Sequence, residues 1–391
     1  MFPEVTIEGM PYERGRRYGA TVPALIRHSI ASYARLFAHR RGLDWTATQA
    51  EALHYLPLLT EVAPDLLEEM RGIAAGAELQ LGEIVALNVR TELMAGIGIG
   101  VTHPDGPAAL ERNRAAGVPQ HVDEPAPPTS ANPPVPDDGE CTTAAVTGAA
   151  SAEGGVFLAQ TWDWQGDQRG ACVLLRVRGP GQPELLTLTE AGMLAKIGVN
   201  RAGVAVGLNL LRSQADGREL GMPVHILLRK MLQAGSFDAA RALADLAPAA
   251  GSSCVTLAGA EDKLVSLELT PGGVGEIWAA NGMLAHANHC LDADAAAGEC
   301  AIEPASTSRE RYDRARVLLA EAHGKVDVAT LQAILRDHAD EPKCICRHPN
   351  PLLARVDRGE SVCGVVIDLK QLLLYVAPDV PCTVPFSQVS L

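Results

Sequence analysis

The sequence predicts an α+β fold in which helices cover antiparallel sheets. Residues 1 to about 100 carry apolar side chains mostly at helical spacing. After residue 141, short apolar runs bounded by Gly, Asn or Pro predict strands in blocks, and helical patterns follow those blocks in pairs. A parallel α/β fold would instead alternate single strands with single helices, so we expect antiparallel sheets.

The N-terminal part, residues 1–102, is predicted to be mostly helical after a short strand at residues 4–8. A helix starts near Pro23, and another near Pro64, because proline is well suited to the first turn of a helix. The apolar residues of the first helix share one face: Leu25, Ile26, Ile30, Tyr33, Leu36 and Phe37. A third helix is expected from about Gly82 to Leu93.

Residues 103–140 form a proline-rich segment between the two halves of the chain. Nine prolines lie between His103 and Asp138. Proline fixes φ and has no backbone donor, so this segment builds neither regular helix nor sheet. We expect an exposed linker that ends at a processing site.

Residues 141–391 are predicted to hold both sheets and four helices. The expected strands are residues 142–147, 156–164, 172–177, 185–189, 194–199, 204–210, 254–257, 264–269, 274–278, 284–287, 362–368 and 372–376. The expected helices are residues 222–233, 236–247, 308–323 and 328–338.

The formal net charge of −14 argues against nucleic acid and anionic membrane surfaces as partners. Two basic clusters are interpreted as solvated helix faces: Arg14, Arg16 and Arg17, and then His39, Arg40 and Arg41. We see no apolar run of the roughly 18–20 residues that a membrane span needs, and no signal peptide at the start. The expectation is a cytoplasmic protein.

Nine cysteines, an odd number, predict free thiols rather than a disulfide framework. Zinc ligands could be imagined at Cys344, Cys346 and His348, with His289 and Cys290 elsewhere. This C-x-C-x-H pattern has no matching second half with the usual zinc spacing. We therefore expect neither a metal nor another cofactor.

Cys141 is the candidate nucleophile, because it stands where the proline-rich segment ends and a β-prone run begins. Cleavage between Glu140 and Cys141 would give one residue both a thiol, with an ordinary pKa of about 8.5, and an α-amine, at about 7.7–8.0. That residue could then supply nucleophile and base together. Thr142 and Thr143 could orient the new terminus. On this motif alone, an ordinary buried strand cysteine remains the alternative.

An ordered series of motifs extends over nearly the whole chain. It resembles the acyl-CoA:6-aminopenicillanate (isopenicillin N) acyltransferase family of N-terminal-nucleophile (Ntn) hydrolases. The motifs are residues 9–15 (GMPYERG), 87–92 (LNVRTE), 139–144 (GECTTA), 160–164 (QTWDW), 200–209 (NRAGVAVGLN), 286–289 (HANH) and 345–348 (ICRH).

The resemblance implies a four-layer αββα fold and self-cleavage before Cys141 into two fragments that stay together. It also implies Asn288 as the oxyanion-hole side chain, Asp163 as a group near the substrate amine, and Arg347 as a substrate-binding cation. Each has a plainer interpretation: Asp163 capping a turn, Asn288 satisfying buried backbone, and Arg347 in a structural ion pair. We interpret Asn200 and Asn209 as hairpin residues, and His289 as a core residue.

The function predicted from these observations is hydrolysis of a small-molecule amide through a thioester acyl-enzyme. One alternative is an acyltransferase that moves an acyl group from CoA or an amide donor to an amine. Another is a non-catalytic binding protein on the same fold. The expected partners are the small-molecule amide or acyl donor and the chain's own cleaved N-terminal fragment.

Overall fold

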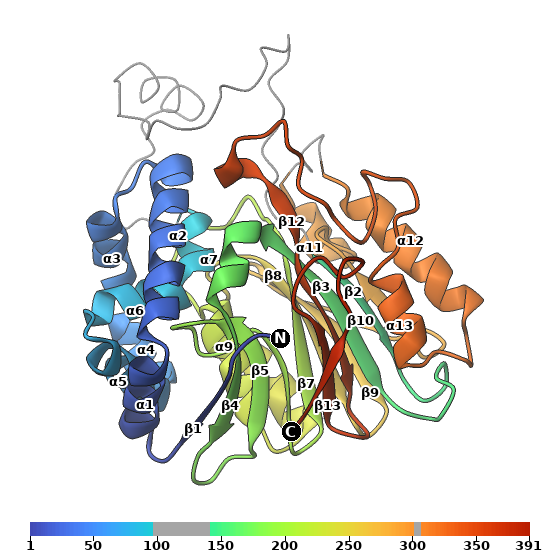
Figure 1. The fold of residues 1–391 in the computed structure, drawn as a ribbon, viewed down its shortest axis with the longest axis horizontal. Coiled ribbons are helices and arrows are strands. Elements are labelled where there is room, and N and C mark those ends of the chain that lie inside the picture. Colours follow the sequence, from blue (N-terminus) through green and yellow to red (C-terminus); the bar gives the residue numbers. More distant parts are fainter. Residues whose placement is uncertain (97–140, 301–305) are drawn as a thin grey trace.

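The computed structural model describes residues 1–96, 141–300 and 306–391. Its core is a pair of β-sheets, one of eight strands and one of six, with helices outside each sheet (Figure 1). The predicted linker at residues 103–140, including Glu140, lies outside the described residues. The boundaries of the three predicted parts of the chain therefore stay predictions.

The eight-stranded sheet has the order β1-β4-β5-β6-β7-β8-β9-β10. Its strands are β1 (Glu4–Glu8), β4 (Cys172–Arg178), β5 (Leu185–Glu190), β6 (Ile197–Asn200), β7 (Val204–Leu210), β8 (Ser253–Gly259), β9 (Lys263–Thr270) and β10 (Gly273–Trp278). Every neighbouring pair is antiparallel except β1 with β4, which run parallel. No hairpin joins these two strands, so chain connectivity does not force them to be antiparallel.

The six-stranded sheet has the order β11-β2-β3-β12-β13-β14 and is antiparallel throughout. Its strands are β11 (Met283–His286), β2 (Thr142–Val146), β3 (Phe157–Gln165), β12 (Gly359–Asp368), β13 (Leu373–Ala377) and β14 (Ser387–Ser390). All residues of β2 and β3 are buried. Both faces of these strands are therefore covered, as in a sheet sandwiched between two other layers.

Those covering layers are the second sheet on one side and helices on the other. Strands β2 and β3 contact β7 across the sheet interface. The helices α12 (Ser308–Glu321) and α13 (Val328–Ile334) pack on the six-stranded sheet, whereas α9 (Val224–Gln233) and α10 (Phe237–Ala242) pack on the eight-stranded sheet. This is the four-layer αββα arrangement that the sequence resemblance implies, so that expectation is confirmed.

The N-terminal helices form one further group beside the sheets (Figure 1). They are α1 (Pro11–Thr21), α2 (Pro23–Arg41), α3 (Trp45–Leu53), α4 (Leu56–Val62), α5 (Pro64–Ala77), α6 (Leu81–Asn88) and α7 (Arg90–Met94). The single helix expected from about Gly82 to Leu93 is two helices, because Val89 between them has non-helical angles, φ −116° and ψ 17°. The remaining short elements are α11 (Ala293–Ala297) and the 3₁₀ turns η1 (Gly166–Ala171), η2 (Leu243–Asp245) and η3 (Arg355–Asp357).

The interpretation of Arg14 as part of a solvated helix face is wrong. Arg14 is 2% exposed and pairs with Glu69, which also pairs with the fully buried Arg229 of α9. A buried carboxylate requires such partners, because an unpaired charge in the interior is costly. This cluster connects α1 and α5 to the helical layer outside the eight-stranded sheet. Within the described residues, none of the helices combines the length and the apolar character needed to cross a membrane.

Candidate active site

Cys141 lies directly before β2 and is 7% exposed. Its backbone N–H donates to Asn288 Oδ1 at 2.7 Å. Its carbonyl oxygen accepts from Asn209 Nδ2 and from the Arg311 guanidinium, both at 2.9 Å. Side chains from β7, α12 and the segment after β11 therefore fix the backbone of Cys141.

Asn288 binds the nitrogen of Cys141 through its acceptor end. Its Oδ1 also accepts from Arg311 at 3.0 Å, and its Nδ2 donates to the carbonyl of Leu210 at 2.9 Å. This orientation is fixed by chemistry, because a flipped amide would put its N–H groups against two donors. In the intact chain the bound nitrogen is that of the Glu140–Cys141 peptide, and it stands in for the α-amine that cleavage would release. The oxyanion role of Asn288 stays a prediction.

Arg311 was missed by the sequence reasoning. It is fully buried on α12, and it donates to the Cys141 carbonyl, to Thr142 Oγ1 at 2.7 Å and to Asn288. A local signal was present, because Arg311 lies four and eight residues before the buried Ala315 and Leu319 and so shares their helix face.

Asn209 was interpreted as a hairpin residue, and the structure instead places it inside β7, fully buried. Its Oδ1 accepts from Thr143 Oγ1 at 2.7 Å while its Nδ2 binds the Cys141 carbonyl. Thr142 and Thr143 thus support Cys141 through Arg311 and Asn209. The signal that could have identified Asn209 is an amide side chain in an otherwise apolar strand.

Asp163 is a fully buried residue of β3. It accepts hydrogen bonds from Ser361 Oγ at 2.7 Å and from Thr161 Oγ1 at 3.3 Å. Burial raises the pKa of Asp163 to about 7, although the charges of Arg347 and Arg311 act in the opposite direction. A carboxyl with this pKa can accept or release a proton near neutral pH.

Burial also raises the pKa of the Cys141 thiol, to about 11, and the charge of Asp163 acts in the same direction. A hydrogen bond from the Asp163 backbone and the charges of Lys196 and Arg311 only partly offset these effects. The thiol of the intact chain is therefore protonated at neutral pH. It needs a base before it can act as a nucleophile, because the thiolate is the reactive form.

Arg347 is 8% exposed and lies near Asp163, but it is not among the residues that line the cavity beside Cys141. Its backbone N–H donates to Ser361 Oγ at 3.0 Å, and its carbonyl accepts from the Ser361 backbone at 3.0 Å. Its charge lowers the pKa of Asp163. The structure thus brings Arg347 and Asp163 together through Ser361.

His289, interpreted as a core residue, is 2% exposed, and its Nδ1 lies 2.7 Å from Ser308 Oγ. The same hydroxyl accepts from the backbone N–H of Asn288 at 2.7 Å. Burial lowers the pKa of His289 to about 4, so the ring is neutral at pH 7. His289 is therefore part of the support around Asn288.

A cavity of about 440 Å³ opens beside Cys141 and Asp163. Its walls combine large apolar and cationic side chains. The apolar ones are Met94, Trp162, Trp164, Leu208, Leu210 and Leu211, and the basic ones are His39, Arg40, Arg41, Arg90, Lys196 and Arg212. The interpretation of residues 39–41 as a solvated helix face is confirmed for His39, which is exposed, whereas Arg40 and Arg41 are half-buried. All three form part of this wall at the end of α2.

Lys196 is a second cation that the sequence reasoning missed. It is 2% exposed, pairs with Glu190 at 2.5 Å, and its Nζ lies 3.4 Å from the centroid of the Trp162 ring. Burial lowers the pKa of Lys196 to about 8. In mildly alkaline solution, Lys196 is therefore a neutral amine in a fraction of the molecules.

Comparisons with known proteins give a consistent family. The sequence model of the family described as "Acyl-coenzyme A:6-aminopenicillanic acid acyl-transferase" matches residues 150–370, so the match begins after Cys141. The chain is 27% identical over 369 residues to the "Acyl-coenzyme A:6-aminopenicillanic-acid-acyltransferase 40 kDa form" of Emericella nidulans. That alignment covers 93% of this chain and 89% of the relative, so it extends over parts of both the N-terminal helices and the sheets.

Two solved structures are more distant. Penicillin V acylase from Agrobacterium tumefaciens is 13% identical with a TM-score of 0.40, over 60% of this chain and 82% of that chain. A variant of conjugated bile acid hydrolase from Clostridium perfringens is 10% identical with a TM-score of 0.44, over 64% of this chain and 92% of that chain.

The raised pKa of Asp163 predicts a pH-dependent change in stability. The folded protein binds the proton of this carboxyl more tightly than the unfolded chain does, so ionising Asp163 lowers stability as the pH rises from about 4 to about 7. Asp163→Asn removes this effect. We expect the free energy of unfolding of the variant, taken relative to that of its parent, to be about 2–3 kcal/mol higher at pH 8 than at pH 5.

The measurement is urea denaturation at both pH values, with Cys141→Ala in both proteins so that each stays a single chain. If the free energies of unfolding of the variant and its parent differed by the same amount at pH 5 and at pH 8, the raised pKa of Asp163 would be contradicted.

Proposed function

The chain belongs to the acyl-coenzyme A:6-aminopenicillanic acid acyl-transferase family, and from this we propose that it is a self-processing N-terminal-cysteine amidohydrolase that cleaves a small-molecule amide. The observation that carries the proposal is the environment of Cys141. Its nitrogen is bound by Asn288 Oδ1, and the residue lines a cavity of about 440 Å³. A terminal amine and thiol at this position would face a bound substrate together.

Self-cleavage converts the Glu140–Cys141 amide into a free terminus. The sulfur of Cys141 attacks the carbonyl carbon of Glu140 and forms a C–S bond, while the thiol proton is transferred toward the nitrogen of Cys141. The C–N bond then breaks, and the nitrogen of Cys141 takes up a proton and becomes the α-amine. Water hydrolyses the thioester, which releases the Glu140 carboxylate and restores the thiol. Asn288 and Arg311 support this sequence because they fix both backbone groups of Cys141 before any bond changes.

Turnover of a substrate amide repeats the same chemistry with the α-amine as the base. The amine accepts the thiol proton, the sulfur attacks the substrate carbonyl, and the protonated amine delivers that proton to the leaving amine. An ordinary α-amine has a pKa of about 7.7–8.0, so it is partly unprotonated near neutral pH. Water then hydrolyses the thioester acyl-enzyme. Asn288 is the predicted oxyanion residue in both halves of the cycle. Because its Oδ1 accepts from Cys141 and one N–H donates to Leu210, the donor would be the second N–H of Nδ2.

The cavity walls suggest the class of substrate. The tryptophans and leucines offer an apolar surface for an acyl chain or ring, and the basic side chains suit an anionic substituent such as a carboxylate. Asp163 is the predicted partner of the substrate amine. Arg347, which the resemblance implies as a substrate-binding cation, does not line the cavity, so we expect it to influence the bound substrate through Ser361 and Asp163. The cleaved fragment 1–140 is expected to remain bound, because α2 and α7 supply part of the wall.

Acyl transfer to an amine is the second candidate. It is favoured by the basic side chains of the cavity, because Arg40, Arg41 and Arg212 could bind the phosphates of a CoA thioester. The printed name of the Emericella nidulans relative describes such an activity. Water and the amine would then compete for the same thioester on Cys141.

Cys141→Ala is expected to abolish self-cleavage, because no thiol remains to attack the Glu140 carbonyl. The wild-type protein should give fragments 1–140 and 141–391 on a denaturing gel and by intact mass, and the variant should stay at full length. Cys300→Ser, another cysteine of the same cavity wall, is the matched control and should cleave normally. Intact wild-type protein, or a cleaved Cys141→Ala variant, would overturn the proposal.

Arg311→Met is expected to slow self-cleavage by about 100-fold, the usual effect of removing one donor from a reacting group. The change removes hydrogen bonds to Cys141, Thr142 and Asn288. Cleavage is followed on gels after expression, with folding checked by circular dichroism. Arg316→Met, on the exposed side of the same helix, should cleave at the wild-type rate, and equal rates for the two variants would contradict the role of Arg311.

The partition between hydrolysis and transfer can be measured directly. The processed protein is incubated with phenylacetyl-CoA or phenylacetamide, with and without 6-aminopenicillanic acid as the amine. We expect phenylacetate as the main product of the amide under both conditions. A new amide that forms faster than phenylacetate would instead establish the acyltransferase as the main activity. No acyl-enzyme and no product from any donor would favour the non-catalytic binding protein.

A further inference from the structure

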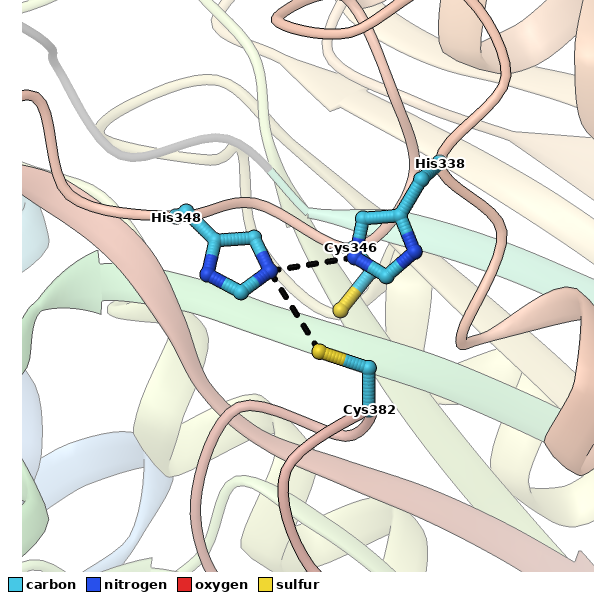
Figure 2. Close-up of side chains that lie close together, drawn as sticks. All are labelled: His338, Cys346, His348 and Cys382. Atoms are coloured by element: carbon cyan, nitrogen blue, oxygen red, sulfur yellow. Dashed lines mark hydrogen bonds between the residues drawn. The ribbon is translucent and has the colours of Figure 1, made fainter.

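Four potential metal ligands lie close together, as Figure 2 shows, and none of them is among the residues that line the cavity. They are His338, Cys346, His348 and Cys382, and their ligand atoms all lie within 4.8 Å of one another. The two imidazole Nε2 atoms are 3.0 Å apart, and Cys382 Sγ is 3.3 Å from His348 Nε2. Three of the four come from the segment between α13 and β12, and Cys382 comes from the segment between β13 and β14.

The donor set and its spacing suit one kind of ion. Two imidazole nitrogens and two thiols are the ligands of a closed tetrahedral zinc site, with Zn–N near 2.0–2.1 Å and Zn–S near 2.3 Å. In a tetrahedron with those bond lengths the ligand atoms are about 3.3–3.8 Å apart. The separations in this cluster require shifts of an ångström or less to reach that geometry.

Packing alone gives no reason for the convergence. His348 and Cys382 are exposed, His338 is half-buried, and Cys346 is fully buried. Exposed imidazole and thiol groups can be solvated separately, so burial does not drive them together. A shared cation would hold the four side chains together, because two thiolates would neutralise the charge of a zinc ion and two neutral imidazoles would complete its coordination.

We propose that His338, Cys346, His348 and Cys382 bind a structural zinc ion. Four protein ligands leave no open coordination position, so the ion takes no part in chemistry on a substrate. From the sequence we expected no metal, because Cys346 and His348 form no zinc motif with Cys344, His289 and Cys290. The fold supplies the missing half of the site from His338 and Cys382, which have no zinc-motif spacing to the other two.

The ion would fasten a segment that contributes to the candidate active site. Cys346 and His348 flank Arg347, whose backbone makes two hydrogen bonds with Ser361. Ser361 in turn donates to Asp163 at 2.7 Å. Zinc would therefore fix residues 338–348 to the segment around Cys382 and keep Arg347 and Ser361 in place beside Asp163. The proposal of a zinc site does not depend on the proposed activity.

Metal content tests the proposal directly. The protein is purified with a reducing agent and without chelators, dialysed, and analysed by plasma mass spectrometry. We expect one zinc per chain in the wild type and a loss of zinc in His348→Ala and in Cys382→Ser. Cys344→Ser is the matched control, because Cys344 is two residues from Cys346 but outside the cluster, and it should retain zinc.

A second measurement covers variants that fail to fold. Wild-type protein stripped with a chelator is titrated with Co²⁺, which should give the intense visible absorption of tetrahedral thiolate coordination and saturate at one ion per chain. The stripped protein should also be cut by trypsin after the exposed Lys343 at least ~10-fold faster, because the ligated segment loses its anchor.

Two results would overturn the zinc site, and a third would overturn its anchoring role. The first is wild-type protein that holds no zinc and shows no cobalt absorption. The second is a disulfide between Cys346 and Cys382 as the form of the protein purified without reducing agent. The third, which removes the anchoring role, is an unchanged rate of cleavage after Lys343 when the metal is stripped.

Discussion

Three side chains from separate parts of the fold hold the backbone of Cys141 in place. Asn288 binds its nitrogen, and Asn209 and Arg311 bind its carbonyl oxygen. These partners come from different layers, because Asn209 is in the eight-stranded sheet and Arg311 is in the outer helix α12. A buried polar group without a hydrogen-bond partner costs free energy. The layers must therefore pack so that these side chains reach the backbone N–H and C=O of Cys141.

The electrostatics of the site follow from the same burial. Removal from water raises the pKa values of both the Cys141 thiol and the Asp163 carboxyl, and nearby cations offset this only in part. The intact chain therefore stores an unreactive thiol beside a carboxyl that titrates near neutral pH. A base generated at Cys141 itself would activate the thiol without requiring a separate histidine, and His289 is neutral and engaged with Ser308.

Local patterns in the sequence predicted much of the fold, because strand alternation and helical spacing depend on neighbouring residues. They predicted antiparallel sheets covered by helices and most strands, but missed α3, α4, α11 and β14 and the break at Val89. The four-layer arrangement was implied by the family resemblance. Contacts distant in sequence had no comparable signal. Arg311 meets Cys141 across 170 residues, and its helical spacing indicates a buried face but not the partner that it meets there. The cluster of His338 and Cys382 with Cys346 and His348 likewise depends on how two loops fold back.

The proposed mechanism requires that Cys141 become a residue with a free amine and a free thiol. The most direct measurement is the reaction of the denatured, reduced protein with 2-cyanobenzothiazole, which condenses with a terminal 1,2-aminothiol to give a stable ring. Internal cysteines lack the amine and do not form this product. We expect one label per chain, found by mass spectrometry on the fragment 141–391 at Cys141. A full-length chain that takes up no stable label, or a label on a fragment that starts at another residue, would contradict it.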